Sequence, residues 1–547
     1  MPPREHSPSA FSRRNRRLVL ATLTAALLTC AAPQAQETTI FDLDKATIDD
    51  IHAAFKAEAL TAERLVQLYL NRIATYDDHG PALNAIITIN PDALEQARAL
   101  DAELAEGELK GPLHGIPVLL KDNYNTADMP TTGGSVALAG SIPHEDAHTV
   151  ARLRDMGAII LGKANLSEFA TPAGRGAYSS MNDVTKNPHR LESDPAGSSG
   201  GSGAAAAANF ATLAFGTDTG GSIRGPAAAN GVVGVRPTYG LVSRAGIIPQ
   251  ALTMDTAGPL ARNVTDAAIA LGVFAGTDPA DPTTVESDSL KQADYTAMLN
   301  KDALDGARIG VVRNYFGGDP EVDALIDAAV ADIVKLGAEV VELNFKDEFV
   351  SSLAPLRAAI NAEFEPDLEE YLAKLDEGYP KSLEEVVRIS VSPEVLNSPR
   401  PVNPGLIETH LQNLLIGGKD NPDYIEALAA VSEVKVTVAA FMDEHEVDAL
   451  VWPTSRCTAE PIYSLPDPDR VCTSGPGASL VATYSGFPDV QVPAGYTSRG
   501  LPTTISFLGR PYSEAQLLGY AFAYEQATLH RKVPELFPEL PGEAFEY

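Results

Sequence analysis

The sequence is short of positive charge. Its 41 lysines and arginines stand against 73 aspartates and glutamates, which gives a formal net charge of −32 at pH 7. A strongly negative surface repels the phosphates of nucleic acids and of anionic lipids. RNA and DNA are therefore disfavoured as partners, and the excess of acids is typical of a protein that stays soluble in an exported or salty setting.

The sequence also lacks internal repeats of fixed period, and no linker rich in proline, glycine or serine separates independent periodic regions. Apolar residues make up 44% of the chain and charged residues 21%, which is ordinary for a globular protein with a sizeable core. The apolar run at residues 18–28 is too short to span a bilayer comfortably. These features exclude a fibrous or disordered chain and a stable membrane span, and they predict one large domain.

The first 35 residues have the composition of a targeting segment. Four arginines between positions 13 and 17 precede the apolar run, and small residues follow it through Ala35. This is the order of the three regions of a secretory signal peptide. We therefore expect residues 1–35 to be removed on export to the periplasm or the medium, which leaves residues 36–547 as the mature protein. A buried N-terminal helix is disfavoured because four arginines beside it would serve no core.

Two features of residues 1–35 are compatible with other routes of export or anchoring. Cys30 ends a sequence similar to a lipoprotein cleavage site, although Thr29 stands where a smaller residue is preferred, so lipid anchoring is the less favoured alternative. The paired arginines weakly resemble a twin-arginine export signal. After cleavage only Cys457 and Cys472 would remain, in an oxidising compartment. They could form a disulfide there or stay as buried thiols.

Apolar runs and helical spacings alternate along the chain. Strands are predicted at residues 85–90, 116–120, 158–161, 309–312, 338–343, 447–452, 489–492 and 503–507. Helices are predicted from Thr47, from Thr61, and at residues 91–106, 147–157, 320–336 and 514–528. This alternation predicts an α/β fold in which a mixed β-sheet carries helices on both faces. Residues 345–445 are charged and mostly helical in pattern, and they form either a wall of the active site or an inert surface layer.

The stretch at residues 197–226 reads GSSGGSGAAAAANFATLAFGTDTGGSIRGP. It has a glycine and serine loop at each end, GSSGG and TDTGGS, joined by an alanine-rich segment of small residues. Glycine lets backbone amides approach a ligand closely, and serine supplies a hydroxyl that attacks or transfers protons. The stretch is therefore suited to present two serines and several N–H donors in one place.

Together with other motifs, this stretch resembles the amidase signature family of serine hydrolases. The family's lysine motif is similar to GPLHGIPVLLKDN at residues 111–123, and LGKANLSEF, DTAGPLARN, VPAG and LLGYAFAYEQAT resemble further family phrases. The likeness covers most of residues 45–530. It implies a single large amidase signature domain, an amide hydrolase activity, and no requirement for a metal or an organic cofactor.

The resemblance also implies roles for individual residues. Ser222 matches the nucleophile of the family, Ser198 matches a second serine that follows a cis peptide bond and transfers the proton, and Lys121 matches the general base. The backbone amides implied to hold the oxyanion are those of Thr219, Gly220, Gly221 and Ser222. The positions implied to brace the two loops are Ser199, Asp218 and Arg224.

A lysine acts as a base only when it is neutral, because an ammonium group has no lone pair to accept a proton. The unbroken apolar run at residues 116–120 predicts a strand that is buried on both faces, with Lys121 at its end. Burial lowers the pKa of a lysine. The sequence therefore predicts the uncharged lysine that this role requires.

Three other motifs are compatible with different chemistry. GSSGG also fits the nucleophile elbow of α/β hydrolases with Ser199 as nucleophile, but LESDPA rather than a buried strand precedes it. HEDAH at residues 144–148 fits the zinc motif H-E-x-x-H, but Pro143 and Asp146 indicate that its histidines straddle a helix start. A phosphate-binding P-loop is excluded because no GK[ST] follows the glycines.

The phrases NPDAL, GPLHGIP, RLRDMGA, LGKANLSE and AYEQAT are most similar to bacterial peptide amidases. This resemblance implies release of ammonia from C-terminal peptide amides or similar carboxamides, while aryl, fatty and cyclic amides stay open. A non-catalytic binding protein is disfavoured because all three catalytic positions are occupied, and a zinc hydrolase because of the HEDAH context. The glutaminase subunits of tRNA-dependent amidotransferases form another branch, but an exported acidic chain is a poor partner for tRNA. The sequence does not indicate an oligomeric state.

Overall fold

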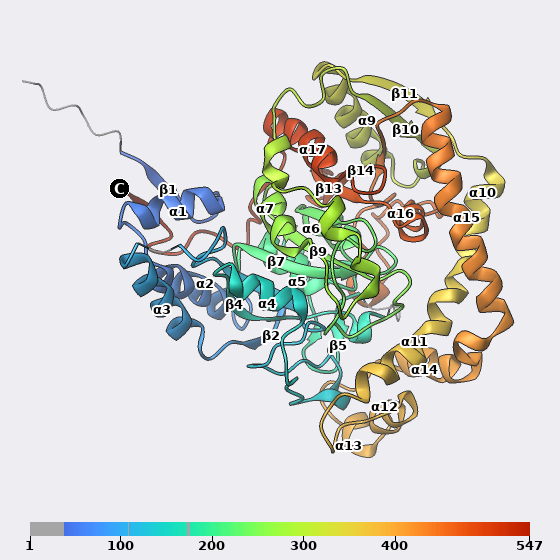
Figure 1. Cartoon of the computed structure of the whole chain (residues 1–547), viewed down its shortest axis with the longest axis horizontal. Helices are drawn as coiled ribbons and strands as arrows, with labels where there is room; N and C mark the ends of the chain where they lie inside the picture. Colours follow the sequence, from blue (N-terminus) through green and yellow to red (C-terminus); the bar gives the residue numbers. More distant parts are fainter. Residues whose placement is uncertain (1–37, 108, 172–175) are drawn as a thin grey trace, which may run out of the picture. The chain divides into compact units, whose positions relative to one another are not determined.

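The computed structural model describes residues 38–107, 109–171 and 176–547 of the chain (Figure 1). The expected signal peptide at residues 1–35, with Cys30, lies outside the described residues. Residues Ile40–Tyr547 form one compact unit. A single large β-sheet organises this unit and positions the residues that the motifs single out.

Eleven strands form one sheet in the part of the chain that the structure describes. Their order from edge to edge is β11 (Glu339–Leu343), β10 (Arg308–Val312), β12 (Ala449–Pro453), β14 (Pro502–Leu508), β13 (Asp489–Tyr496), β8 (Val233–Arg236), β9 (Thr256–Ala261), β7 (Leu213–Asp218), β3 (Pro117–Lys121), β4 (Ile159–Ala164) and β2 (Ile86–Ile89). β10 is parallel to β11 and β12, and β3 is parallel to β4 and β7. The remaining neighbours are antiparallel, which confirms the predicted mixed sheet.

Strands near the middle of the sheet are buried on both faces. Every residue of β3, β4, β7 and β9 is buried, which explains why these strands are apolar or small along most of their length. The edge strand β11 instead exposes Glu339 and Glu342, and charge at an edge opposes pairing with another chain. The strand predicted at residues 116–120 is confirmed as β3, and its last residue is Lys121.

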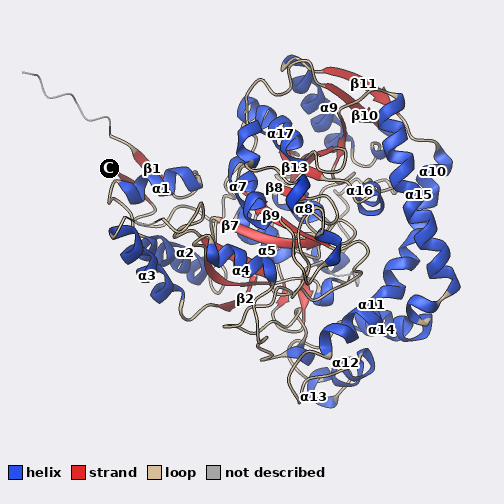
Figure 2. Ribbon diagram, viewed as in Figure 1, coloured by secondary structure: helices blue, strands red, loops and turns tan. Residues whose placement is uncertain are grey.

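Two groups of helices cover the sheet (Figure 2). α5 (Gly200–Ala207) and α6 (Arg224–Asn230) contact each other and pack on β7 and β8. In the second group, α7 (Val264–Phe274) packs on β9 and contacts both α4 (His148–Asp155) and α17 (Glu514–Thr528). The sheet therefore carries helices on both faces, as predicted.

Helix starts that capping residues predict are confirmed. α1 (Ile48–Lys56) begins after Thr47, whose hydroxyl accepts the N–H of Asp50, while the Asp50 carboxylate accepts the N–H of Thr47. α2 (Ala62–Tyr76) begins after Thr61, whose hydroxyl also accepts a backbone N–H. α3 (Ala93–Ala105) and α9 (Pro320–Lys335) lie where the sequence pattern predicts them.

The region between β11 and β12 is helical, as predicted for residues 345–445. Its helices in the described chain are α10 (Asp347–Leu353), α11 (Arg357–Leu372), α12 (Leu383–Ser390), α13 (Pro393–Leu396), α14 (Pro404–Ile416) and α15 (Pro422–Glu444). α15 contacts α11 and also packs on α16 (Ser479–Ser485). An apolar cluster that includes Val438, Met442 and Trp452 joins this region to β12.

Short elements complete the unit. β1 (Ile40–Asp42) pairs with β15 (Ala544–Glu546), so the two ends of the compact unit meet. β5 (Tyr178–Ser179) pairs with β6 (Asp183–Val184), and α8 (Ser287–Leu290) is a single turn. No helix among the described residues is both long and apolar enough to cross a membrane.

Candidate active site

Lys121 and Ser198 meet in the interior of the protein. Lys121 ends β3 and is fully buried, and its Nζ donates hydrogen bonds to Ser198 Oγ at 2.8 Å and to Thr217 Oγ1 at 2.7 Å. Thr217 lies on β7, the parallel neighbour of β3. The adjacency of these two strands therefore places the predicted base beside Thr217, and the loop before α5 brings the predicted proton carrier to the same amine.

The surroundings of Lys121 favour its neutral form. Burial lowers the pKa of Lys121 to about 7, although the carboxylates of Asp218 and Asp255 favour the charged form. Its hydrogen-bond partners among the described residues are two hydroxyls and a carbonyl, all neutral. Lys163, also fully buried, instead lies 3.1 Å from Asp122 in an ion pair. Of these two buried lysines, Lys121 is the one without a counter-ion.

Ser198 follows a cis peptide bond to Gly197, as the resemblance implies. The carbonyl of Ser198 accepts the N–H of Ser167 at 3.0 Å. A Cβ atom at position 197 would lie 2.5 Å from Ser167 Oγ, so a larger residue would fit only if the Ser167 hydroxyl moved. Glycine at position 197 therefore leaves room for the Ser167 hydroxyl.

Ser222 lies in the 219–222 loop, which connects β7 to α6. Its side chain is half-buried and lines a cavity. Its carbonyl accepts the N–H of Ser199 at 3.2 Å, and the Ser199 hydroxyl donates to the Thr217 carbonyl at 3.1 Å. Ser199 thus ties the loop of Ser222 to the loop of Ser198 and to β7, which is a bracing position.

The 219–222 loop differs in one respect from the expectation. The N–H of Gly221 donates to Asp218 Oδ1 at 2.9 Å, so this donor is committed inside the loop and does not face a ligand. The N–H groups of Thr219, Gly220 and Ser222 have no acceptor in the part of the chain that the structure describes. A Cβ atom at Gly220 would meet nothing within 4 Å, which leaves open space for a carbonyl group.

Asp218 is held at the centre of a buried charge cluster. Arg224 Nη2 donates to its Oδ1 at 3.0 Å and Arg236 Nη1 donates to the same oxygen at 2.7 Å. Burial alone would raise the pKa of Asp218, but the two guanidinium groups outweigh it and hold that pKa well below its usual range. Arg224 also donates to the Ser479 carbonyl at 2.7 Å. The cluster therefore fixes the start of the 219–222 loop against α16.

Sequence reasoning names Asp218 and Arg224 but misses Arg236, Thr217 and Asp255. Arg236 ends β8, and Asp255 directly precedes β9. The signal that could have found Arg236 is an arginine at the end of the apolar run VVGV, where it needs a buried carboxylate partner. Thr217 and Asp255 give no comparable signal.

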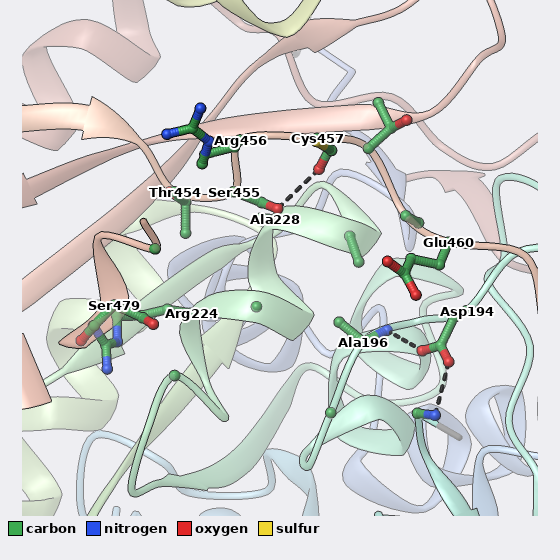
Figure 3. A pocket seen from close by; sticks show the side chains of 18 of the residues that line it. Asp194, Ala196, Arg224, Ala228, Thr454, Ser455, Arg456, Cys457, Glu460 and Ser479 are labelled. Carbon is green, nitrogen blue, oxygen red and sulfur yellow. Dashed lines mark hydrogen bonds between the residues drawn. The ribbon is translucent and has the colours of Figure 1, made fainter. Parts of the chain in front are cut away.

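The cavity beside Ser222 has a volume of about 640 Å³. Ser167, Ser198, Gly220 and Ser222 lie on its wall, and residues 453–461 and 472–479 supply much of the rest. Figure 3 shows Arg224 and Ser479 on one side of it and Asp194 and Glu460 on the other. Cys457 and Cys472 form a disulfide in this wall, which decides the question that the sequence leaves open.

The helical region reaches the same cavity. Arg357, the first residue of α11, lies on the cavity wall. Of the two interpretations of residues 345–445, this placement favours a wall of the site.

The structure does not support the rival motifs. Ser199 is fully buried behind the cavity wall and follows no strand directly. His148 is the first residue of α4, whereas His144 lies before the helix and is 3.0 Å from Asp376. Among the described residues, no group of three or more histidines, cysteines, aspartates and glutamates is arranged to hold a metal ion.

Comparison with known proteins supports the motif-based resemblance over nearly the whole chain. A family model described as Amidase matches residues 64–518. A probable amidase of Arabidopsis thaliana is 36% identical over 533 residues, which cover 94% of this chain and 97% of that protein. A glutamyl-tRNA(Gln) amidotransferase subunit of Geobacter sp. (strain M21) is 35% identical over 505 residues, which cover 89% of this chain and 98% of that protein.

Among solved structures, the native peptide amidase from Stenotrophomonas maltophilia is similar with a TM-score of 0.81 and 39% identity, and the match covers 90% of this chain and 99% of that chain. Both the sequence and the fold are thus those of amide hydrolases. The chain belongs to the amidase signature family.

Proposed function

We propose that the protein hydrolyses carboxamides with Ser222 as nucleophile, Ser198 as proton carrier and Lys121 as base. The observation that carries this proposal is the 2.8 Å hydrogen bond from Lys121 Nζ to Ser198 Oγ, in surroundings that contain no counter-ion for the lysine among the described residues. With a pKa of about 7, Lys121 is substantially neutral at physiological pH and has a lone pair to accept a proton.

The reaction then has two halves. Ser222 Oγ attacks the carbonyl carbon of the amide while its proton passes to Ser198 Oγ, and the proton of Ser198 passes to Lys121 Nζ. The same path returns a proton to the leaving nitrogen, so that ammonia departs and an ester to Ser222 remains. Water, deprotonated along this path, attacks the ester and releases the carboxylic acid.

The developing oxyanion needs N–H donors that are not already used. Gly220 and Ser222 line the cavity and have free N–H groups among the described residues, and Thr219 adjoins them. The N–H of Gly221 is not assigned to the oxyanion, because its hydrogen bond to Asp218 holds the shape of the loop. We therefore assign the oxyanion to the N–H groups of Thr219, Gly220 and Ser222.

We propose C-terminal amides of short peptides as the substrates. The similarity to the Stenotrophomonas maltophilia peptide amidase supports this class, and a cavity of about 640 Å³ has room for a peptide end. The amidotransferase relatives are also similar, but a chain with a net charge of −32 is a poor partner for tRNA. The composition of residues 1–35 supports export, so peptides outside the cytoplasm are the proposed pool.

The test is ammonia release from an N-acylated dipeptide C-terminal amide, measured for wild type, Ser222→Ala and Ser202→Ala with a chelator present. Ser202 is a matched control, because it is buried in α5 and its one hydrogen-bond acceptor among the described residues is the Phe215 carbonyl. Release by wild type and Ser202→Ala but not by Ser222→Ala is expected. Full activity of Ser222→Ala would refute the nucleophile, and loss of wild-type activity with chelator would point to metal hydrolysis. Turnover of aryl, fatty or cyclic amides alone would refute the peptide substrate.

A further inference from the structure

The 219–222 loop is attached to a second loop just beyond the end of the sheet. The ladder between β7 and β9 ends at the pair Asp218 and Thr256. One residue further on, the Thr219 hydroxyl donates to Asp255 Oδ1 at 2.5 Å. The pairing of the two strands is thus continued by side chains at the point where the loop with Ser222 begins.

A parallel link lies beside it. Arg236 donates from Nη1 to Asp218 Oδ1 at 2.7 Å and from Nη2 to the Met254 carbonyl at 3.0 Å. Two consecutive residues of one chain segment, Asp218 and Thr219, are therefore held to two consecutive residues of the other, Met254 and Asp255. This double attachment fixes the direction in which the backbone leaves β7.

The second oxygen of Asp255 anchors the far side of the link. Asp255 Oδ2 accepts the N–H of Gln250 at 2.8 Å and the N–H of Ala251 at 3.0 Å, and Gln250 lines the cavity. One buried carboxylate thus accepts three hydrogen bonds and joins the 219–222 loop to another part of the cavity wall.

The segment that carries Asp255 is itself clamped by the helical region. Glu363 of α11 accepts the N–H of Thr253 at 3.0 Å and the hydroxyl of Tyr424 at 2.8 Å, and Asp367 of α11 accepts the N–H of Leu252 at 2.9 Å. Hydrogen bonds to α11 therefore hold the segment that carries Asp255 in place.

The charge of Asp255 is not cancelled in the way that the charge of Asp218 is. Both carboxylates act on Lys121 and favour its charged form. Asp218 is paired with Arg224 and Arg236, whereas Asp255 forms no ion pair within 4.0 Å among the described residues. Arg244 also acts on Asp255, but it is paired with Asp281 at 2.6 Å. Burial raises the pKa of Asp255, and the three hydrogen-bond donors and the nearby Arg244 oppose that rise by favouring the ionised form.

We propose that Asp255 is a positioning residue of the amide hydrolysis. Through the Thr219 hydroxyl it fixes the backbone N–H groups of the 219–222 loop, and its negative charge supports the ammonium group that Lys121 becomes after it accepts the proton. The inference rests on the proposed roles of Ser222, Ser198 and Lys121.

Two substitutions separate the effect of the Thr219–Asp255 hydrogen bond from the effect of the negative charge of Asp255. Asp255→Asn keeps the shape, since its oxygen can accept the two N–H groups while its NH₂ donates to the Thr219 hydroxyl, but it removes the charge. Thr219→Val removes the link and keeps the charge, and Thr219→Ser restores the hydroxyl. Glu363→Gln is the matched control, because it alters a buried carboxylate that anchors the same segment from α11.

The measurement is the pH profile of kcat/KM, together with kcat and KM, for each folded variant with a neutral amide. Asp255→Asn should move the acid limb to lower pH, because loss of a nearby negative charge lowers the pKa of Lys121. Thr219→Val should lower kcat roughly ten- to a hundredfold with KM little changed, and Thr219→Ser should recover most of it. Glu363→Gln should lower thermal stability without moving the limb.

The inference would be overturned if the acid limb of the pH profile did not move in Asp255→Asn. It would also be overturned if Thr219→Val had the kcat of wild type. If Asp255→Asn does not fold, the Thr219 pair still decides the link. Lys121→Ala distinguishes this inference from the proposed function. Activity in that variant would refute the proposed base itself, whereas an inactive Lys121→Ala with an unmoved limb in Asp255→Asn would refute only the role of Asp255.

Discussion

Lys121 Nζ lies 2.8 Å from Ser198 Oγ, although 77 residues separate the two in the sequence. The hydrogen bond joins the end of β3 to the loop that precedes α5. In buried surroundings, a neutral amine can exchange donor and acceptor roles with a hydroxyl, which an ammonium group cannot do. The distance and the absence of a counter-ion among the described residues together make this pair suited to carry a proton in both directions.

The activity should follow the protonation of Lys121. Because its pKa is lowered to about 7, kcat/KM for a neutral amide is expected to rise with pH along a limb with a midpoint near 7 and to level off above it. Such a profile reports the essential groups of the free enzyme. A midpoint near about 4, the pKa of an ordinary carboxylate, would contradict Lys121 as the base.

Replacing Lys121 should stabilise the fold at low pH. The pKa of Lys121 is about 7 when folded against 10.5 ordinarily, so below pH 7 both states are charged and the full penalty of burial is present. Between these values the unfolded chain binds more protons, and wild-type stability gains with rising pH. Lys121→Met is therefore expected to be more stable than wild type near pH 6, with the difference shrinking toward pH 10, as measured by denaturant unfolding.

Lys163→Met serves as the control, because it is expected to change stability in the opposite direction. The ammonium group of Lys163 is paired with buried Asp122 at 3.1 Å, so Lys163→Met leaves a buried carboxylate without its cation. Breaking a buried pair typically destabilises a protein by about 3–5 kcal/mol. Stabilisation by both substitutions, or by neither, would contradict the different states assigned to the two lysines.

Two glycines of the central stretch should fail in different ways when changed to alanine. A Cβ atom at Gly201 would lie 2.6 Å from Asn165 N and 2.7 Å from Ala85 O, both backbone atoms, whereas at Gly220 it would meet nothing within 4 Å. Gly201→Ala is expected to lower the melting temperature, while Gly220→Ala keeps it and raises KM because the methyl group projects into substrate space. Thermal unfolding and steady-state kinetics check both. Equal melting temperatures would contradict the close packing assigned to Gly201.

The disulfide should matter for binding more than for chemistry. Cys457 and Cys472 close a loop whose residues line the cavity, whereas Lys121, Ser198 and Ser222 lie on other elements. The double variant Cys457→Ser/Cys472→Ser, which leaves no unpaired thiol in the wall, is expected to raise KM for a peptide amide severalfold with kcat nearly unchanged. Reduction of wild type should have the same effect. A fall in kcat at constant KM would contradict this division.

The sequence predicts most of the elements that have a strong local pattern. The helix at residues 514–528 is found with its bounds unchanged as α17, and the apolar runs correspond to β2, β3, β4 and the strands β10 to β14. The strands β7, β8 and β9 and the helix α7 are not predicted. Their segments are rich in glycine, alanine and threonine, which fit the crowded middle of the sheet but carry weak strand or helix signals.

The residues of the candidate site also divide into those that the sequence predicts and those that it does not. Motifs and their spacing identify Lys121, Ser198 and Ser222 because these residues lie inside long, specific phrases. Arg236 and Asp255 reach the site through the order of the strands, which places β9 next to β7 and β8 next to β9, and a local pattern does not contain that order. The commitment of the Gly221 N–H to Asp218 depends on the detailed path of a loop, which a motif does not specify.

Lys121 and Asp122 are neighbours in the chain, yet one reaches Ser198 and the other reaches Lys163. Lys121 is the last residue of β3 and Asp122 lies in the turn that follows, so the register of β3 determines which of the two side chains reaches Ser198. A single deletion within β3 that kept the pairing of its first residues would bring Asp122 to the place of Lys121, and Lys121 to the place of Leu120, opposite Lys163. The pairing register of β3 with its neighbours therefore determines whether a lysine or an aspartate lies beside Ser198.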